Sequence, residues 1–215
     1  MNYNTVIFDL DGTLLDTLDD LADSLDHTLT EVGAPTLTRA QVRRYVGNGM
    51  ARLIELALPG GRDDPRYDRT LETMQAYYKA HNQIKTAPYP GVMELIDELR
   101  RRGYALAVVS NKPDTSVKPL VKSYFGDSIP VAIGQRPDVR RKPAPDAVEE
   151  ALRQLGRDRS EAVYVGDSEV DLYTARNAGM DCISVTWGFR DRELLDSEGA
   201  TRYADTPAEV LNWLE

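Results

Sequence analysis

The feature that most constrains the fold is a recurrent alternation between short apolar runs and stretches with helical spacing. Apolar runs lie at residues 6–8, 104–109 and 162–165, and helical patterns separate them. Alternation of this kind implies a mostly parallel sheet with right-handed crossovers and helices on both faces. We therefore predict an α/β fold with a Rossmann-like, doubly wound parallel sheet as its core.

The elements from Gly91 onward are placed by apolar spacing and by turn residues. Strands are predicted at 104–109, 131–133 and 162–165, and helices at 92–99, 115–124, 145–155 and 170–178. A last helix is expected after Thr206, with Pro207 at its first position and Glu209 at its third. This combination is typical of a capped helix N-terminus.

Only helical patterns fill the segment from about Asp16 to Ala87. Helices are predicted there at about 18–29, 39–46, 50–58 and 65–82. Pro88-Tyr89-Pro90-Gly91 then marks the return of the chain to its parent domain. The sequence therefore predicts a core formed by residues 1–15 and 88–215, with an all-helical cap domain, residues 16–87, inserted after the first strand.

Polar clusters lie at the boundaries of the predicted elements, and the ends of strands are where α/β sheets place their chemistry. The first cluster is Asp9-Leu10-Asp11-Gly12-Thr13, whose two aspartates leave a strand on the same face. The others are Ser110-Asn111-Lys112, Lys142-Pro143-Ala144-Pro145 and the stretch 166–171. Aspartates also cap turns, but two like charges held together favour a divalent cation, and Mg²⁺ prefers oxygen ligands.

This order of acidic, hydroxyl, lysine and acidic clusters resembles the haloacid dehalogenase superfamily of aspartyl-phosphate enzymes, and the resemblance runs through essentially the whole chain. Within the superfamily, the sequence is most similar to the phosphoglycolate phosphatases. The segments that carry this finer likeness are Asp16-Thr17, Val46-Gly47-Asn48-Gly49, Gly134-Gln135-Arg136 and Thr186-Trp187-Gly188. The resemblance implies a Mg²⁺-dependent phosphatase that acts on a small phosphorylated metabolite.

The resemblance also implies roles for the residues of the core clusters. Asp9 matches the nucleophile that forms an aspartyl-phosphate, and Asp11 matches the general acid that later activates water. Asp9, the backbone carbonyl of Asp11 and the carboxylate of Asp167 would hold the Mg²⁺ ion. Lys142 would balance the charge that builds up on the phosphoryl group.

Further positions are expected to complete the site. Ser110 and Asn111 would donate hydrogen bonds to the phosphoryl oxygens, and Thr13 would have a supporting role. Asp171 lies one helical turn beyond the metal-binding aspartate, so it would either support the surroundings of the metal or orient Lys142.

Substrate choice is expected to depend on the cap. Gly47, Asn48 and Gly49 precede a predicted helix, and a helix N-terminus there would suit a carboxylate on the substrate. The same three residues also fit a simple turn between two helices. The loop Trp187-Gly188-Phe189-Arg190 either reaches the site or covers the edge of the sheet, and the sequence leaves both readings open.

Several neighbouring functions are disfavoured. Dehalogenases of the superfamily lack the second aspartate, sugar-phosphate mutases carry a histidine near the place of Leu21, and there is no GxxxxGK[ST] P-loop. His27 and His81 both fall in the helical cap segment and are expected to be surface or packing residues. The alternatives that remain are a phosphatase for pyrophosphate or a sugar phosphate, a phosphotransferase, and an inactive phosphate-binding protein that would be expected to have lost part of the core site.

Charge and apolar patterning indicate the context in which the chain works. The formal net charge of −9 opposes binding to nucleic acid and to anionic lipid. No apolar run approaches the ~18–20 residues of a membrane helix, and no signal-peptide pattern opens the chain. We therefore expect a cytoplasmic protein without nucleic-acid or membrane partners, in which the single Cys182 is a small core residue.

Overall fold

The computed structural model describes residues 3–214, which form two compact units. The first unit takes in the chain up to Leu15 and again from Pro88 onward, and the second is Asp16–Ala87. No helix within 3–214 is long and apolar enough to cross a membrane.

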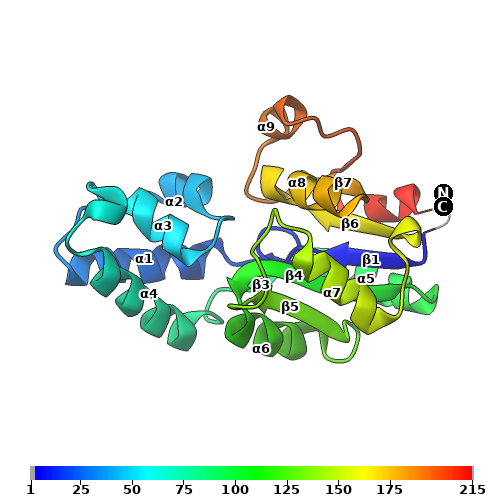
Figure 1. Cartoon of the computed structure of the whole chain (residues 1–215), viewed down its shortest axis with the longest axis horizontal. Coiled ribbons are helices and arrows are strands. Elements are labelled where there is room, and N and C mark those ends of the chain that lie inside the picture. Colours follow the sequence, from blue (N-terminus) through cyan, green and yellow to red (C-terminus); the bar gives the residue numbers. More distant parts are fainter. Residues whose placement is uncertain (1–2, 215) are drawn as a thin grey trace. The chain divides into compact units, whose positions relative to one another are not determined.

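A parallel six-stranded sheet forms the centre of the first unit, in the order β5-β4-β1-β6-β7-β8 (Figure 1). Its central strand β1 (Thr5–Phe8) lies between β4 (Ala105–Pro113) and β6 (Ala162–Gly166). In this register Ile7 lies opposite both Ala107 and Tyr164. The carboxyl ends of three strands that are distant in sequence therefore meet at one edge. The outer strands are β5 (Val131–Gln135), β7 (Asp181–Val185) and β8 (Tyr203–Ala204).

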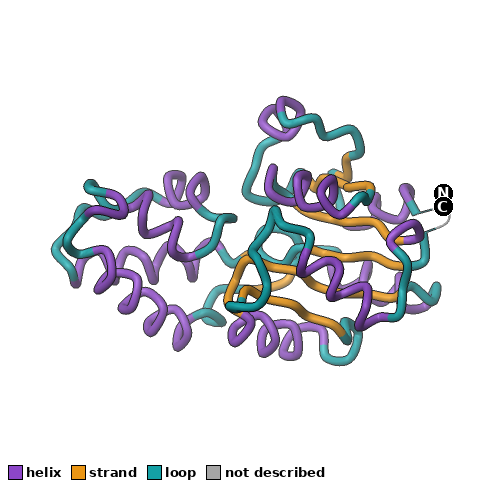
Figure 2. The backbone as a smooth tube through the Cα atoms, in the orientation of Figure 1, coloured by secondary structure: helices purple, strands orange, loops and turns teal. Residues whose placement is uncertain are grey.

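Helices cover both faces of this sheet (Figure 2). Val6 and Phe8 of β1 pack into one buried cluster and Ile7 into another, because successive side chains of a strand point to opposite faces. One cluster includes residues of α5 (Val92–Arg101), α6 (Asp114–Phe125) and the 3₁₀ helix η3 (Pro207–Trp213). The other includes residues of α7 (Asp146–Leu155) and α8 (Glu169–Ala178), and also contacts Cys182. The shorter helices of the unit are η2 (Arg159–Glu161) and α9 (Arg192–Ser197).

Between its first and last residues, the second unit is built from helices and the loops that join them. They are α1 (Leu18–Glu31), α2 (Arg39–Tyr45), α3 (Met50–Ala57), η1 (Gly61–Asp63) and α4 (Tyr67–His81). The chain enters and leaves through two short paired strands, β2 (Leu15–Asp16) and β3 (Ala87–Pro88). The predicted fold class, a doubly wound parallel sheet with an inserted helical domain, is confirmed.

A buried carboxylate anchors the returning segment of the helical unit. Asp20 of α1 is only 2% exposed, and its oxygens accept hydrogen bonds from the backbone N–H groups of Ile84, Lys85 and Thr86 at 2.9–3.1 Å. His27 and His81 stack on the two faces of Tyr77, so both imidazoles have a packing role in this unit.

Two predicted elements differ from the structure. Ser110-Asn111-Lys112 were predicted to follow the strand, but β4 continues to Pro113 and includes them. They lie in its last residues, where the register with β5 shifts. The last helix is a 3₁₀ helix, and Thr206 makes no capping hydrogen bond with its side chain. Thr206 is the N-cap and Pro207 opens the helix as predicted, but the N–H of Glu209 donates to the backbone carbonyl of Thr206 at 3.0 Å rather than to its hydroxyl.

Candidate active site

Two aspartates meet at the carboxyl edge of the sheet because they follow neighbouring strands. Asp9 directly follows β1 and donates its backbone N–H to the carbonyl of Val165 in β6 at 2.9 Å, while Asp167 directly follows β6. Both side chains are buried. Oxygens of Asp9, Asp167 and Asp171 all lie within 4.8 Å of one another. The local sequence and the parallel pairing therefore concentrate negative charge at one point.

The buried Lys142 offsets part of this charge. The Nζ of Lys142 donates to Asp9 Oδ1 at 2.7 Å, to Asp171 Oδ1 at 2.7 Å and to the hydroxyl of Tyr164 at 3.0 Å. An ammonium group has three protons, so these acceptors use all of them. Lys142 is 3% exposed and is thereby fixed beside Asp9.

The burial of these groups shifts their pKa values in a coupled way. Burial raises the pKa of Asp9 well above its ordinary value, against the opposing effect of Lys142. Burial alone would lower the pKa of Lys142, but Asp171 and Asp9 more than offset this and raise it. Lys142 therefore stays protonated, and its positive charge lies next to the carboxylate of Asp9.

Asp171 is engaged with protein groups on both of its oxygens. Oδ1 accepts from Lys142, and Oδ2 accepts from the backbone N–H of Ser168 at 3.1 Å and from its hydroxyl at 2.6 Å. Ser168 is the N-cap of α8, so the cap of this helix and the orientation of Lys142 share one carboxylate. Of the two roles considered for Asp171, the geometry favours the orientation of Lys142.

Asp167 is held by one hydrogen bond on each oxygen. Oδ1 accepts from the hydroxyl of Thr13 at 3.0 Å, and Oδ2 accepts from the backbone N–H of Phe189 at 2.7 Å. Burial, followed by the charge of Asp171, raises the pKa of Asp167 to about 7. Each oxygen still has a lone pair available for a further partner.

Asp11 lies in a separate polar contact. Lys112 Nζ is 2.6 Å from Asp11 Oδ1, and the hydroxyl of Ser110 donates to Asp11 Oδ2 at 3.3 Å. Asn111 donates from Nδ2 to the backbone carbonyl of Lys142 at 3.2 Å. The predicted core residues of four chain segments therefore form two polar clusters, one around Lys142 and one around Asp11, and Asn111 of the second segment contacts Lys142.

Two residues of the site were missed from the sequence. Tyr164 stands in a run of valines and is therefore expected to be a core side chain, although its hydroxyl contacts Lys142. Lys112 belongs to a motif that was recognised, but its partner Asp11 is 101 positions away along the chain. In the sequence, only the position of Lys112 next to the recognised pair Ser110-Asn111 indicated that it could belong to the site.

The donor set fits a divalent cation. Asp9 and Asp167 offer carboxylate oxygens in a buried place, and hard cations such as Mg²⁺ prefer oxygen ligands. The four carboxylates of the cluster, including Asp11 and Asp171, face two lysine ammonium groups. A divalent cation bound there would favour the ionised forms of Asp9 and Asp167, whose pKa values are raised by burial.

The predicted substrate-binding residues of the insertion lie in the helical unit. Gly47, Asn48 and Gly49 precede α3, which begins at Met50, and the two glycines have φ angles of 109° and 80°. Residues that carry a side chain rarely adopt such φ angles, so this turn favours glycine. The backbone N–H groups at the start of α3 are the feature that suits an anion.

The fold and the site define a hydrolase class, and comparisons with known proteins identify it. The profile of the family described as "Haloacid dehalogenase-like hydrolase" matches residues 6–185. The chain belongs to this family.

Curated relatives and a solved structure extend the likeness over nearly the whole chain. A phosphoglycolate phosphatase from Pseudomonas putida is 35% identical, covering 93% of this chain and 75% of the relative. One from Mesorhizobium japonicum is 36% identical, covering 92% and 89%. A crystal structure from Lactobacillus delbrueckii subsp. bulgaricus is 38% identical with a TM-score of 0.93, covering 100% of this chain and 99% of that one. The prediction of a phosphatase of the haloacid dehalogenase type is confirmed.

Proposed function

We propose that this chain hydrolyses 2-phosphoglycolate through an aspartyl-phosphate formed on Asp9. The observation that carries the proposal is the buried contact between Asp9 and Lys142 at 2.7 Å, beside the carboxylate of Asp167. A carboxylate with a fixed cation next to it can attack phosphorus while the added negative charge is offset.

The reaction divides into two steps. In the first, a carboxylate oxygen of Asp9 attacks the phosphorus atom, and Asp11 gives a proton to the leaving alkoxide oxygen. In the second, Asp11 takes a proton from a water molecule, which attacks the phosphorus and releases inorganic phosphate from Asp9. Ser110 and Asn111 donate hydrogen bonds to phosphoryl oxygens, and Lys142 stabilises the charge that spreads over them.

The carboxylates of Asp9 and Asp167, together with the backbone carbonyl of Asp11, would hold one Mg²⁺ ion. The ion would neutralise phosphoryl charge and orient the phosphate for attack. Thr13 supports this arrangement through its hydrogen bond to Asp167. Residues 16–87 would act as a cap that excludes bulk water during transfer, and the core of residues 1–15 and 88–215 would carry the chemistry.

The choice of a small carboxylated phosphomonoester rests on two supports. The curated relatives from Pseudomonas putida and Mesorhizobium japonicum bear the name phosphoglycolate phosphatase. Gly47, Asn48 and Gly49 lead into the N-terminus of α3, and backbone N–H groups at a helix N-terminus can donate to a substrate carboxylate.

The substrate is tested by the rate of phosphate release in the presence of Mg²⁺. We expect kcat/KM for 2-phosphoglycolate to exceed the values for pyrophosphate, sugar phosphates and an aryl phosphate. If a sugar phosphate or pyrophosphate is preferred, the mechanism stands and the substrate assignment is wrong. If no phosphate ester is hydrolysed, the chain is not a phosphatase for small molecules.

The nucleophile is tested by Asp9→Asn. The amide cannot form the aspartyl-phosphate, so turnover should fall by at least about 10³-fold, while the circular dichroism spectrum should stay that of the native protein. Asp138→Asn is the matched control, because Asp138 is exposed and pairs only with Arg136 among the contacts described. Substantial activity in Asp9→Asn would refute the assignment.

A further inference from the structure

A loop that follows β7 reaches the metal-binding carboxylate. The loop Trp187-Gly188-Phe189-Arg190 comes from the segment between β7 and α9. Its Phe189 N–H donates to Asp167 Oδ2 at 2.7 Å, and both Gly188 and Phe189 are buried. Of the two readings that the sequence left open, the loop therefore reaches the site.

The backbone of this loop lies so close to Asp167 that Gly188 has no room for a side chain. A Cβ atom on Gly188 would lie 2.3 Å from Asp167 Cβ and 2.5 Å from the carbonyl oxygen of Gly12. Gly12 approaches the same carboxylate, since a Cβ there would lie 2.5 Å from Asp167 Oδ2. Two glycines from separate segments thus pack directly against the side chain of Asp167, so a larger residue at either position would displace this carboxylate.

Two anchors hold the loop in this place. The indole Nε1 of Trp187 donates to the carbonyl of Thr13 at 3.0 Å, and Thr13 in turn donates its hydroxyl to Asp167 Oδ1. Arg190 Nε is 2.8 Å from Glu169 Oε2, and the Arg190 side chain is only 8% exposed. The loop, Thr13 and Asp167 therefore form a closed ring of hydrogen bonds that fixes both oxygens of the carboxylate.

We propose that the Trp187-Gly188-Phe189-Arg190 loop positions Asp167 for binding Mg²⁺, with Gly188 and Trp187 as positioning residues that touch neither substrate nor metal. The inference rests on the proposed role of Asp167 as a metal ligand. Groups that orient a ligand contribute to metal affinity because they remove the cost of ordering the carboxylate when the ion binds. A displaced Asp167 would still be present but would no longer present its free lone pairs correctly.

Gly188→Ala tests the close approach. The full chain is titrated with MgCl₂ by calorimetry, and the variant is expected to raise the Kd for Mg²⁺ by about 10- to 100-fold, the usual range for such partners. Val148→Ala is the control, because Val148 is fully buried in the cluster on the other face of the sheet. It should lower the Tm while leaving the Kd for Mg²⁺ unchanged.

Trp187→Phe is the second variant, since it keeps an aromatic ring and removes only the indole N–H donor. It should raise the Kd for Mg²⁺ several-fold, and it decides the question if Gly188→Ala does not fold. A Kd within twofold of wild type in every folded variant would overturn the inference. Failure of the wild-type protein to bind Mg²⁺ saturably would instead overturn the metal site of the proposed function, so the two failures are distinguishable.

Discussion

Asp171→Asn tests whether Lys142 depends on the Asp171 carboxylate for its position. In the structure one oxygen of Asp171 accepts from Lys142 at 2.7 Å and the other accepts from Ser168. Asparagine has a single carbonyl oxygen, and if this keeps the bonds to Ser168, its amide NH₂ faces the ammonium group. A donor then meets a donor, and Lys142 keeps only Asp9 and Tyr164 as acceptors.

The size of the effect follows from the kind of bond that is lost. A hydrogen bond that involves a charged group contributes about 1.5–3 kcal/mol. Each 1.36 kcal/mol lost from transition-state stabilisation lowers the rate about tenfold. If the loss is felt where Lys142 balances charge on the phosphoryl group, kcat/KM should fall by roughly 10- to 150-fold.

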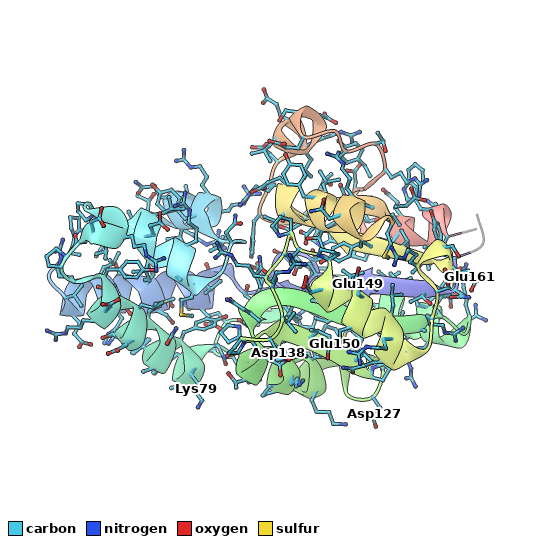
Figure 3. The ribbon with its side chains drawn as sticks, viewed as in Figure 1. Lys79, Asp127, Asp138, Glu149, Glu150 and Glu161 are labelled. Carbon is cyan, nitrogen blue, oxygen red and sulfur yellow. The ribbon has the colours of Figure 1, made fainter. Side chains whose placement is uncertain are left out.

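The assay is steady-state phosphate release at saturating Mg²⁺, with Asp138→Asn as the control. Asp138 is an exposed carboxylate of the same unit and is labelled in Figure 3. Activity of Asp171→Asn within twofold of wild type would show that Lys142 is held without it. Full recovery of activity at higher Mg²⁺ concentration would show that Asp171 acts at the metal and not through Lys142.

Two further predictions concern protonation and the helical unit. The pKa of Asp167 is raised to about 7 from its ordinary 3.8, so the metal-free fold favours the protonated carboxyl group. The contribution of this proton to the stability of the fold is fully present below about pH 4 and is lost as the pH rises through 7. Mg²⁺ must displace that proton, so its Kd, measured by calorimetry, should fall about fivefold between pH 6 and 7 and about tenfold by pH 8, and level off above; a flat profile would contradict this. Asp20→Ala removes the acceptor of three backbone N–H groups at residues 84–86. It should destabilise this segment by at least about 1 kcal/mol and speed hydrogen exchange at these amides. Unchanged protection from exchange would refute the role of Asp20.

Four strands of the sheet and most of its helices were predictable because their sequence signals are local, whereas β7, β8 and α9 were not predicted. The apolar run at 6–8 is buried on both faces, as a central parallel strand must be, and this alone indicates its place in the sheet. Helix α3 spans Met50–Ala57 where 50–58 was predicted, and α7 spans Asp146–Leu155 where 145–155 was predicted. Apolar spacing and turn residues are sufficient to locate such elements.

The rest of the site depends on contacts between distant segments. The Tyr164 hydroxyl becomes a polar group of the site only when β6 lies beside the segment that contains Lys142. No local sequence pattern predicts this contact. The loop that contains Gly188 was recognised in the sequence, but its contact with Asp167 was not, because the 2.3 Å that would separate a Gly188 Cβ from Asp167 Cβ depends on the folded chain. Thr206 shows the converse case, since its local pattern locates the N-cap correctly, but the N–H of Glu209 donates to the backbone carbonyl of Thr206 and not to its hydroxyl.

The paired strands β2 and β3 have a consequence for how such a chain can diversify. Because Leu15–Asp16 and Ala87–Pro88 are held side by side, and Tyr89 N–H donates to the carbonyl of Leu14 at 3.1 Å, the two ends of the insertion are fastened by the core's own backbone. The free energy of closing a loop between fixed ends rises only slowly with its length. An insertion of another size or shape can therefore replace this one between the same two strands. A lineage of such proteins can change its substrate by replacing one contiguous segment, while the phosphoryl-transfer chemistry of the core is kept.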